Sequence, residues 1–328
     1  MLTHFVSRLL LTSVLFLTCF ANIVCSGATA QDELLVSDNF SNQILRYDGT
    51  TGAFLGVLVS GDPGVNGGLD APVGMRISAN NTLLVASQNT NSILEYNRFS
   101  GAFLGVWAST NMNGPADMRF GNDGNLYVAN FFGNSVTRFD SFGNPLGVFT
   151  SGGPGIAGTA SINFSPGATS NLYVGNFNGS DVQVFDGTTG SFISQFATGF
   201  AGAAGLYFDI DDTVWVASLF TGDISHFAAD GTPLGNFSTG ATSFPSYIEI
   251  NPNNTNELLI ALTGAGGVYR FGKDGTPLGV FAAGGGLLVP GQFLFASAIP
   301  EPNSLFLMAI TGVALFTRRR CRTNSAST

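Results

Sequence analysis

The sequence predicts an all-β fold, a six-bladed β-propeller of four-stranded blades, and three observations support this prediction. One pattern recurs six times: a branched apolar residue, a second eight positions later, and an aromatic residue three positions after that. Successive copies start 42 to 49 residues apart, a period typical of propellers and solenoids. A further apolar segment precedes every copy except the first, and a spare segment follows the last. The anchors are Val36, Ile44 and Tyr47; Val85, Ile93 and Tyr96; Val128, Val136 and Phe139; Val174, Val182 and Phe185; Val216, Ile224 and Phe227; and Ile260, Val268 and Phe271.

Each copy is predicted to form antiparallel strands. Between Asn125 and Phe149, alternating β-branched and aromatic runs are separated by Asn and Gly turns, which indicates three strands. The segment before each copy supplies a fourth strand. These segments are PVGMRIS (72 to 78), PADMRFG (115 to 121), ASINFS (160 to 165), AAGLYFD (203 to 209) and PSYIEIN (245 to 251).

The first copy lacks such a segment, and the missing piece is PGQFLFAS, Pro290 to Ser297. We expect this C-terminal strand (about 290–297) to pair into the blade that begins near Glu33. Pairing between the chain ends would close the ring and leave no long open edge. A β-sandwich is the alternative, but it predicts neither a constant unit nor a displaced final strand.

The turns agree with this division of the chain. Asn122-Asp123-Gly124, Asp211-Asp212 and Pro252-Asn253-Asn254 fall between predicted first and second strands. Asp-Gly pairs fall between third and fourth strands, at 48–49, 186–187, 230–231 and 274–275. We expect their glycines to supply the positive φ that tight hairpins require.

Composition excludes several functional classes. Charged residues make up 10% of the chain, against about 25% in an ordinary soluble domain. Between Gln31 and Ile299 there are 20 acidic and 7 basic residues, a net charge of −13, so nucleic acid is not an expected partner. Cys19, Cys25 and Cys321 all lie outside the repeats, which leaves no disulfide, cysteine metal site or thiol nucleophile within them.

Residues 1–30 have the form of a signal peptide. A basic start is followed by the apolar run LLLTSVLFLTCFANIV and by an A-x-A cleavage signal at Ala28 and Ala30. A lipoprotein processed at Cys25 is the rival interpretation, which the bulky Val24 disfavours. A buried N-terminal helix is a further alternative, but no amphipathic face marks one.

Residues 299–328 form a second targeting segment. Pro300, Glu301 and Pro302 precede an apolar helix (about 304–317), and Arg318, Arg319 and Arg320 begin the basic tail (318–328). The apolar run from Leu305 to Phe316 has twelve residues and spans about 18 Å as a helix, short of a bilayer core of about 30 Å. The arginines favour a membrane-inserted helix nonetheless, because they would stay on the cytoplasmic side.

This order of elements resembles the PEP-CTERM sorting signal of Gram-negative bacteria. The resemblance implies that a membrane-embedded exosortase recognises the Pro-Glu-Pro motif and removes the helix and tail. The protein would then be exported to the cell envelope, the cell surface or an extracellular matrix. A plain C-terminal membrane anchor is the alternative.

The body from 31 to 298 carries a second resemblance. The pattern P-x-G, then V-A-[DNS], then N-x-[IV]-x-x-[FY] is similar to the NHL repeat, with Pro72 and Gly74 at its start and Val128, Ala129 and Asn130 in its middle. The turn asparagines are Asn42, Asn91 and Asn134; later copies have Ser180, Gly222 and Gly266 instead, and Leu262 replaces the polar residue. The resemblance implies a propeller that is a binding platform in most members and a lyase or lactonase in some.

Candidate binding residues come from aligning the predicted innermost strands. One equivalent position holds Arg76, Arg119, Asn163, Tyr207, Glu249 and Leu294. Because the third blade of six faces the sixth, Arg119 is expected to look across the channel at Glu249. The functional hypothesis is a polar channel mouth that binds a small anionic or sugar-like ligand. The alternative is that these residues form hydrogen bonds between blades.

No catalytic constellation emerges. The sequence predicts no metal and no cofactor. Glu249 and Asn163 alone are too few ligands for a metal site in the channel. The acidic cluster Asp209, Asp211 and Asp212 lies where a hairpin turn is expected. His226 lies on a third strand, at a position that varies freely, so we expect a solvated residue and no general base. The predicted function is therefore non-catalytic binding or scaffolding of a glycan or protein. A lactonase or lyase with a metal in the channel is the alternative.

Overall fold

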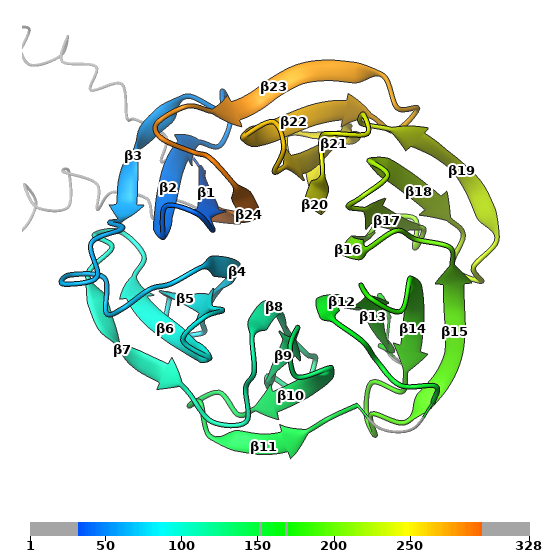
Figure 1. The fold of residues 1–328 in the computed structure, drawn as a ribbon, viewed down its shortest axis with the longest axis horizontal. Coiled ribbons are helices and arrows are strands. Elements are labelled where there is room, and N and C mark those ends of the chain that lie inside the picture. The colour runs from blue at the N-terminus through cyan, green and yellow to red at the C-terminus, as the bar shows by residue number, and fades with distance from the viewer. Residues whose placement is uncertain (1–31, 151–152, 168–169, 297–328) are drawn as a thin grey trace, which may run out of the picture. The chain divides into compact units, whose positions relative to one another are not determined.

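A computed structural model describes residues 32–150, 153–167 and 170–296. These residues form six four-stranded antiparallel sheets around a common axis, and this confirms the predicted six-bladed propeller (Figure 1). The predicted signal peptide, with Ala28 and Ala30, and the predicted sorting segment, from Pro300 to its arginines, lie outside the described residues. No helix that could span a membrane occurs within the described ranges.

The blades share one strand order, which runs from the axis outward. Blade 1 contains β24 (Pro290–Ala296), β1 (Glu33–Asp38), β2 (Gln43–Asp48) and β3 (Phe54–Val59). Blade 2 contains β4 (Pro72–Ile77), β5 (Thr82–Ser87), β6 (Ser92–Asn97) and β7 (Phe103–Ala108). Blade 3 contains β8 (Pro115–Phe120), β9 (Leu126–Asn130), β10 (Ser135–Phe139) and β11 (Pro145–Val148).

Blades 4 to 6 repeat this order. Blade 4 contains β12 (Thr159–Phe164), β13 (Leu172–Asn176), β14 (Asp181–Phe185) and β15 (Phe192–Thr198). Blade 5 contains β16 (Ala203–Phe208), β17 (Val214–Ser218), β18 (Asp223–Phe227) and β19 (Pro233–Ser238). Blade 6 contains β20 (Pro245–Asn251), β21 (Asn254–Leu262), β22 (Gly267–Gly272) and β23 (Pro277–Ala283).

The ring closes through the strand borrowed from the C-terminal side. β24 pairs antiparallel with β1, with Glu33 opposite Ala296 and Val36 opposite Phe293. The closing strand therefore has the position predicted for Pro290 to Ser297, and its described part ends at Ala296.

The apolar core lies between neighbouring blades. All 18 repeat anchors are at most 8% exposed. At the closing seam, Leu34 and Val36 of blade 1 pack with Leu259 and Ala261 of blade 6, and a similar cluster fills each of the other five seams. Each sheet thus buries both faces against its neighbours, which explains why its second strand is apolar almost throughout.

The Asp-Gly turns follow the prediction in two blades and depart from it in two. Gly231 and Gly275 have φ of 87° and 85°, as predicted. In blades 1 and 4 the turn is longer, and the positive φ lies three residues later, at Gly52 and Gly190 (both 73°). The reason in blade 1 is that the Asp48 carboxylate accepts the N–H groups of Thr50 and Thr51, which extends the turn.

Candidate functional site

Three positions of each innermost strand face or approach the axis. The register of all six innermost strands shifts by one residue after their first residue, a β-bulge that inserts the second residue as an extra one. The fourth residue points away into the core between blades and is at most 1% exposed. These fourth residues are Met75, Met118, Ile162, Leu206, Ile248 and Phe293. The second, third and fifth residues are left to shape the channel.

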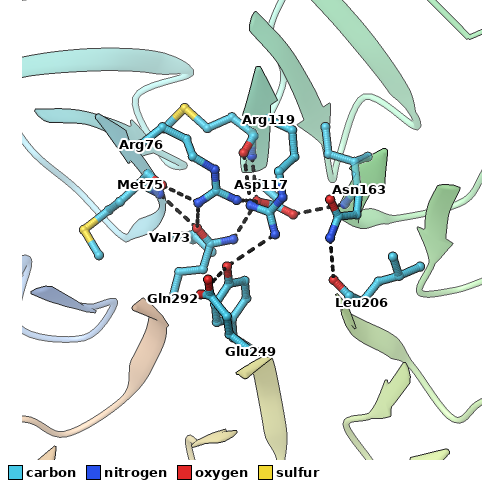
Figure 2. Close-up of polar contacts among 12 residues, drawn as sticks. Val73, Met75, Arg76, Asp117, Arg119, Asn163, Leu206, Glu249 and Gln292 are labelled. Carbon is cyan, nitrogen blue, oxygen red and sulfur yellow. Dashed lines mark hydrogen bonds and ion pairs between the residues drawn. The ribbon is translucent and has the colours of Figure 1, made fainter. Parts of the chain in front are cut away.

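The buried carboxylate of Asp117, the third residue of β8, is the centre of a polar network across the channel (Figure 2). Its Oδ1 atom accepts hydrogen bonds from Arg76 Nη2 at 3.3 Å, Arg119 Nη1 at 3.0 Å and Gln292 Nε2 at 2.6 Å. Its Oδ2 atom accepts the backbone N–H of Ile162 at 3.0 Å. One side chain of blade 3 therefore binds groups of blades 1, 2 and 4.

Gln292, the third residue of β24, repeats this geometry one seam away. Its Oε1 accepts the backbone N–H of Met75 at 3.0 Å and Arg76 Nη1 at 3.1 Å. Burial raises the pKa of the Asp117 carboxyl, while the Arg76 charge and the hydrogen bonds from Ile162 and Gln292 oppose that rise.

Glu249 lies beside this network and contacts it through Tyr247. Arg119 Nη2 donates to Tyr247 Oη at 3.3 Å, and Tyr247 Oη donates to Glu249 Oε2 at 3.4 Å. Arg119 and Glu249 are thus bridged by a hydroxyl and do not form the direct pair that their opposite blades suggested. Burial raises the pKa of Glu249 to about 7, against the opposing charge of Arg76.

The remaining members of the predicted ring have other partners. Asn163 Nδ2 reaches the carbonyl of Leu206 in blade 5 at 3.5 Å, and burial raises the pKa of Tyr207 above its usual range. Leu294 is half-buried and packs against the core between blades 1 and 2. The six residues share the fifth position of their innermost strands, and Arg76, Arg119 and Asn163 each have a polar contact with another blade. Ligand binding by Arg76, Arg119, Asn163, Tyr207 and Glu249 stays a prediction.

A cavity of about 280 Å³ lies at the end of the channel where the innermost strands begin. Tyr247 and Gln292, two members of the polar network, form part of its lining. The second residues of the innermost strands form its wall: Val73, Ala116, Ala160, Ala204, Ser246 and Gly291. Five of these six have small side chains, which leaves the space open.

The rim of this cavity comes from the turns between second and third strands. The cavity together with its rim is called the mouth below. Its first turn residues are Asn39, Gln88, Phe131, Phe177, Leu219 and Thr263. In every blade, the backbone N–H of this residue donates to the carbonyl of the residue just before the innermost strand, at 2.8 to 3.2 Å. Six equivalent hydrogen bonds therefore fix the rim to the channel wall.

A polar channel mouth was predicted, but neither Asp117 as the network centre nor the residues that line the cavity were identified from the sequence. Asp117 is two residues before Arg119 on the same face of β8, so strict alternation could have revealed it. The lining of the cavity was harder to predict, because the second residue of each innermost strand faces the channel only as a result of the bulge. A signal existed in the turns, where Phe131-Phe132 and Phe177 follow the buried second strand.

Other predicted sites are explained by structure. Asp209 accepts Trp215 Nε1 at 3.1 Å and Lys273 Nζ at 2.7 Å, and Asp211 binds Thr213 within the hairpin. Within the described ranges, no group of three His, Cys, Asp or Glu residues could hold a metal ion. Residues 209–212 form the hairpin turn between β16 and β17 that the sequence predicted, with the N–H of Asp209 donating to the carbonyl of Thr213 at 2.8 Å.

His226 lies on a third strand as predicted, but the expectation that it is solvated was wrong. Its ring stacks on that of Trp215, with the ring centroids 3.8 Å apart and the ring planes at 2° to each other. Its Nε2 atom is 2.8 Å from Thr213 Oγ1. Burial lowers the pKa of the imidazole. The indole lies beside His226 because the two residues are directly opposite each other in the β17–β18 pair.

Comparison with known proteins supports the fold. No family model matches the chain, and no curated protein sequence matches it either. A chain of a nidogen–laminin complex is similar over 82% of this chain and 99% of its own length, with a TM-score of 0.66 and 11% identity. Two lyases are also similar, each at 13% identity.

A streptogramin B lyase is similar over 80% of this chain and 90% of its own length, with a TM-score of 0.59. A catalytically inactive virginiamycin B lyase from Staphylococcus aureus, solved with quinupristin, is similar over 77% of this chain and 85% of its own length, with a TM-score of 0.57. At this level of identity the likeness concerns the fold. Six-bladed propellers of this shape thus include both a component of a binding complex and lyases.

Proposed function

We propose that the chain is a non-catalytic binding propeller that takes its ligand at the mouth. The observation that carries the proposal is the cavity of about 280 Å³, whose wall and rim come from equivalent positions of all six blades. The groups with catalytic potential, Asp117 and Glu249, lie deeper and engage the arginines and Tyr247. A pocket lined by apolar groups and a few polar ones is typical of a binding site.

A lyase is the second candidate, and one contrast with a similar structure favours binding. The virginiamycin B lyase carrying a histidine-to-alanine replacement is catalytically inactive. In the described part of this chain the only histidine is His226, which lies on β18 and stacks on Trp215. It belongs to a third strand, whereas the channel is lined by first strands.

Elemental analysis separates the two candidates. A lactonase or lyase of the metal-dependent kind would hold calcium or zinc in the channel. We expect the purified protein to contain neither in stoichiometric amount and to need no cofactor. A bound metal that is lost when Glu249 is replaced by Gln would favour the enzyme.

The export proposal rests on the two ends of the sequence. We propose that this NHL-like protein is exported through its signal peptide and sorted by an exosortase through Pro300, Glu301 and Pro302. Its ligand would then be a glycan or protein at the cell surface or in an extracellular matrix. Mass spectrometry of protein from a host with an exosortase should find the chain starting near Gln31 and ending near Pro300. A full-length C-terminus in that host would contradict this.

Binding at the mouth is tested by filling it. Ala204 is half-buried at the second position of β16, so Ala204→Phe places a ring inside the cavity. Ala102→Phe is the matched control, in the exposed turn between β6 and β7 on the opposite face. A panel of saccharides, amino acids, short peptides and aromatic acids is screened by ligand-observed NMR. At least one probe should bind wild type and the control but not Ala204→Phe.

The ring of Arg119 and Glu249 makes a separate prediction. If these side chains contact the ligand, replacing both by Gln abolishes binding of the probe found above. Unchanged binding would remove them from the site and leave the mouth alone. Binding that survives Ala204→Phe would contradict the mouth proposal.

A further inference from the structure

The rim of the mouth is divided into an apolar half and a polar half. Phe131, Phe177 and Leu219 belong to blades 3, 4 and 5, whereas Asn39, Gln88 and Thr263 belong to blades 1, 2 and 6. In a ring of six, blade 1 faces blade 4, blade 2 faces blade 5 and blade 3 faces blade 6. Every apolar rim residue therefore faces a polar one across the cavity.

The apolar half is a continuous row of aromatic rings. Phe132 contacts Phe131 with ring centroids 5.3 Å apart, Phe131 contacts Phe177 at 5.4 Å, and Phe177 contacts Phe220 at 5.3 Å. The outer two, Phe132 and Phe220, are each 57% exposed. These T-shaped contacts fix the rings against one another, so the row presents a preformed aromatic wall.

The polar half offers side-chain amides. Among the described residues, the amide groups of Asn39 and Gln88 have no hydrogen-bond partner, although their backbones are fixed to the channel wall. Thr263 Oγ1 donates to the carbonyl of Phe244 at 3.0 Å and keeps its acceptor capacity. An amide both donates and accepts, so this wall suits a ligand whose polar groups do the same.

Charge and size restrict the ligand further. None of the described residues that line the cavity carries a charge, so an ionic ligand would lose its hydration without gaining a countercharge from the lining. A volume of about 280 Å³ corresponds to roughly nine water molecules, enough for one or two small rings. A sugar ring meets these conditions, because it has C–H faces for aromatic rings and hydroxyl groups that donate and accept.

We infer that the mouth binds an uncharged saccharide, with one sugar ring against Phe177 and its hydroxyl groups on Asn39 and Gln88. This inference rests on the proposed function and names its ligand class. The partial positive charge of the sugar C–H groups faces the negative face of the aromatic ring. The two amides gain from the sugar the hydrogen bonds that no side chain or backbone group of the described residues gives them.

The test measures binding of methyl glycosides of glucose, galactose and N-acetylglucosamine by saturation-transfer NMR and calorimetry. Methyl glycosides of glucuronic and galacturonic acid are the charged counterparts. We expect at least one neutral glycoside to bind saturably, and its uronic acid counterpart to bind at least tenfold more weakly. Uronic acids that bind as tightly as neutral sugars would overturn the inference.

Side-chain replacements test the two walls. Phe177→Leu keeps an apolar side chain but loses the ring face, and Asn39→Leu removes an amide at similar volume. Each should weaken binding of the neutral glycoside at least tenfold. Phe142→Leu is the matched control, since Phe142 is 81% exposed on the opposite face. If either variant fails to fold by circular dichroism, Phe220→Leu and Gln88→Leu replace it. If the variants of both walls bind the neutral glycoside with unchanged affinity, the inference is contradicted.

The outcome also separates this inference from the proposed function. If a peptide or aromatic acid binds in an Ala204→Phe-sensitive way and no glycoside does, the saccharide assignment is wrong while the mouth is still a binding site. If no probe of any class binds, both proposals are wrong.

Discussion

Blades 1 to 3 are tied to their next neighbours by a side chain that blades 4 to 6 do not have. In the first three blades, the turn between second and third strands contains Asn42, Asn91 or Asn134. Their Oδ1 atoms accept the backbone N–H of Ala71, Gly114 and Gly158, which precede the next blade, at 2.7 to 2.8 Å.

Blades 4 to 6 keep the backbone conformation of this turn but lack the asparagine hydrogen bond to the next blade. This hydrogen bond is called the clamp below. Asn42, Asn91 and Asn134 have φ of 49° to 58°, and Ser180, Gly222 and Gly266 have φ of 58° to 75°. Gly222 could not carry an asparagine, because a Cβ there would lie 2.2 Å from the carbonyl oxygen of Gly240. The repeat thus requires the left-handed turn in every blade, whereas the clamp between blades is optional.

The polar network at the axis has the same asymmetry. Asp117 joins blades 1 to 4 by direct hydrogen bonds, while blade 5 contributes the carbonyl of Leu206 to Asn163. The seam between blades 4 and 5 therefore depends more on apolar packing, whereas Lys273 of blade 6 forms an ion pair with Asp209 of blade 5. We expect amide hydrogen exchange to show that the seam between blades 4 and 5 opens first.

Removing Asp117 should have the largest effect. Asp117→Ala leaves two arginines inside the channel without their carboxylate, and the free energy of unfolding should fall by about 3 to 5 kcal/mol. Denaturant unfolding measures this loss, with Asp223→Ala in blade 5 as the matched control. An effect no larger than that of the control would show that the axis does not fix the first four blades.

The pH dependence of stability should reveal Glu249 in the other half. Its pKa is raised to about 7, so its contribution to stability is complete below about pH 4.5 and is lost as the pH rises to about 7. Between pH 5 and 8, wild type should lose about 2 kcal/mol more than Glu249→Gln, measured by denaturant unfolding. Parallel profiles for the two proteins would contradict the raised pKa.

Introducing the clamp where it is absent should destabilise the protein. Gly222→Asn restores the repeat residue, but the new Cβ would collide with the backbone of Gly240. We expect a loss of about 2 kcal/mol in thermal or denaturant unfolding, as for other overpacked sites. A gain in stability would mean that blade 5 can accept the clamp after all.

Removing the clamp where it is present should have the smallest effect. Asn91→Gly permits the left-handed φ but leaves the N–H of Gly114 without its acceptor, at a cost of about 1 kcal/mol. Asn81→Gly, in the exposed turn between β4 and β5 and with a left-handed φ of 61°, is the control for backbone flexibility. If both variants lose the same free energy of unfolding, the whole effect comes from the backbone freedom of glycine and not from the lost hydrogen bond.

The fold was predictable because its determinants are local and repeated. The spacing of Val128, Val136 and Phe139 specifies a hairpin, and six such hairpins with a displaced segment at Pro290 require a closed ring. The contacts of the site were not predictable in the same way. Arg119 was placed on the channel, but its bridge to Glu249 through Tyr247 depends on side-chain distances across the axis.

The mouth was less accessible to sequence reasoning than the ring of Arg76 and Glu249. Strict alternation puts Ala204 on the same face as Leu206, toward the core, and only the bulge turns it toward the cavity. The lengthened turn at Asp48 has a similar origin, since its carboxylate competes with the hairpin pattern for backbone N–H groups.

The pairing of Glu33 with Ala296 has a geometric consequence for the whole body. The innermost strands start at the mouth and run away from it, so Ala296 at the end of β24 and Glu33 beside it lie on the reverse side of the disc. The polypeptide therefore enters and leaves the disc at neighbouring points behind the cavity. Among the described residues, the front of the body is formed by turns, and neither Glu33 nor Ala296 lies there.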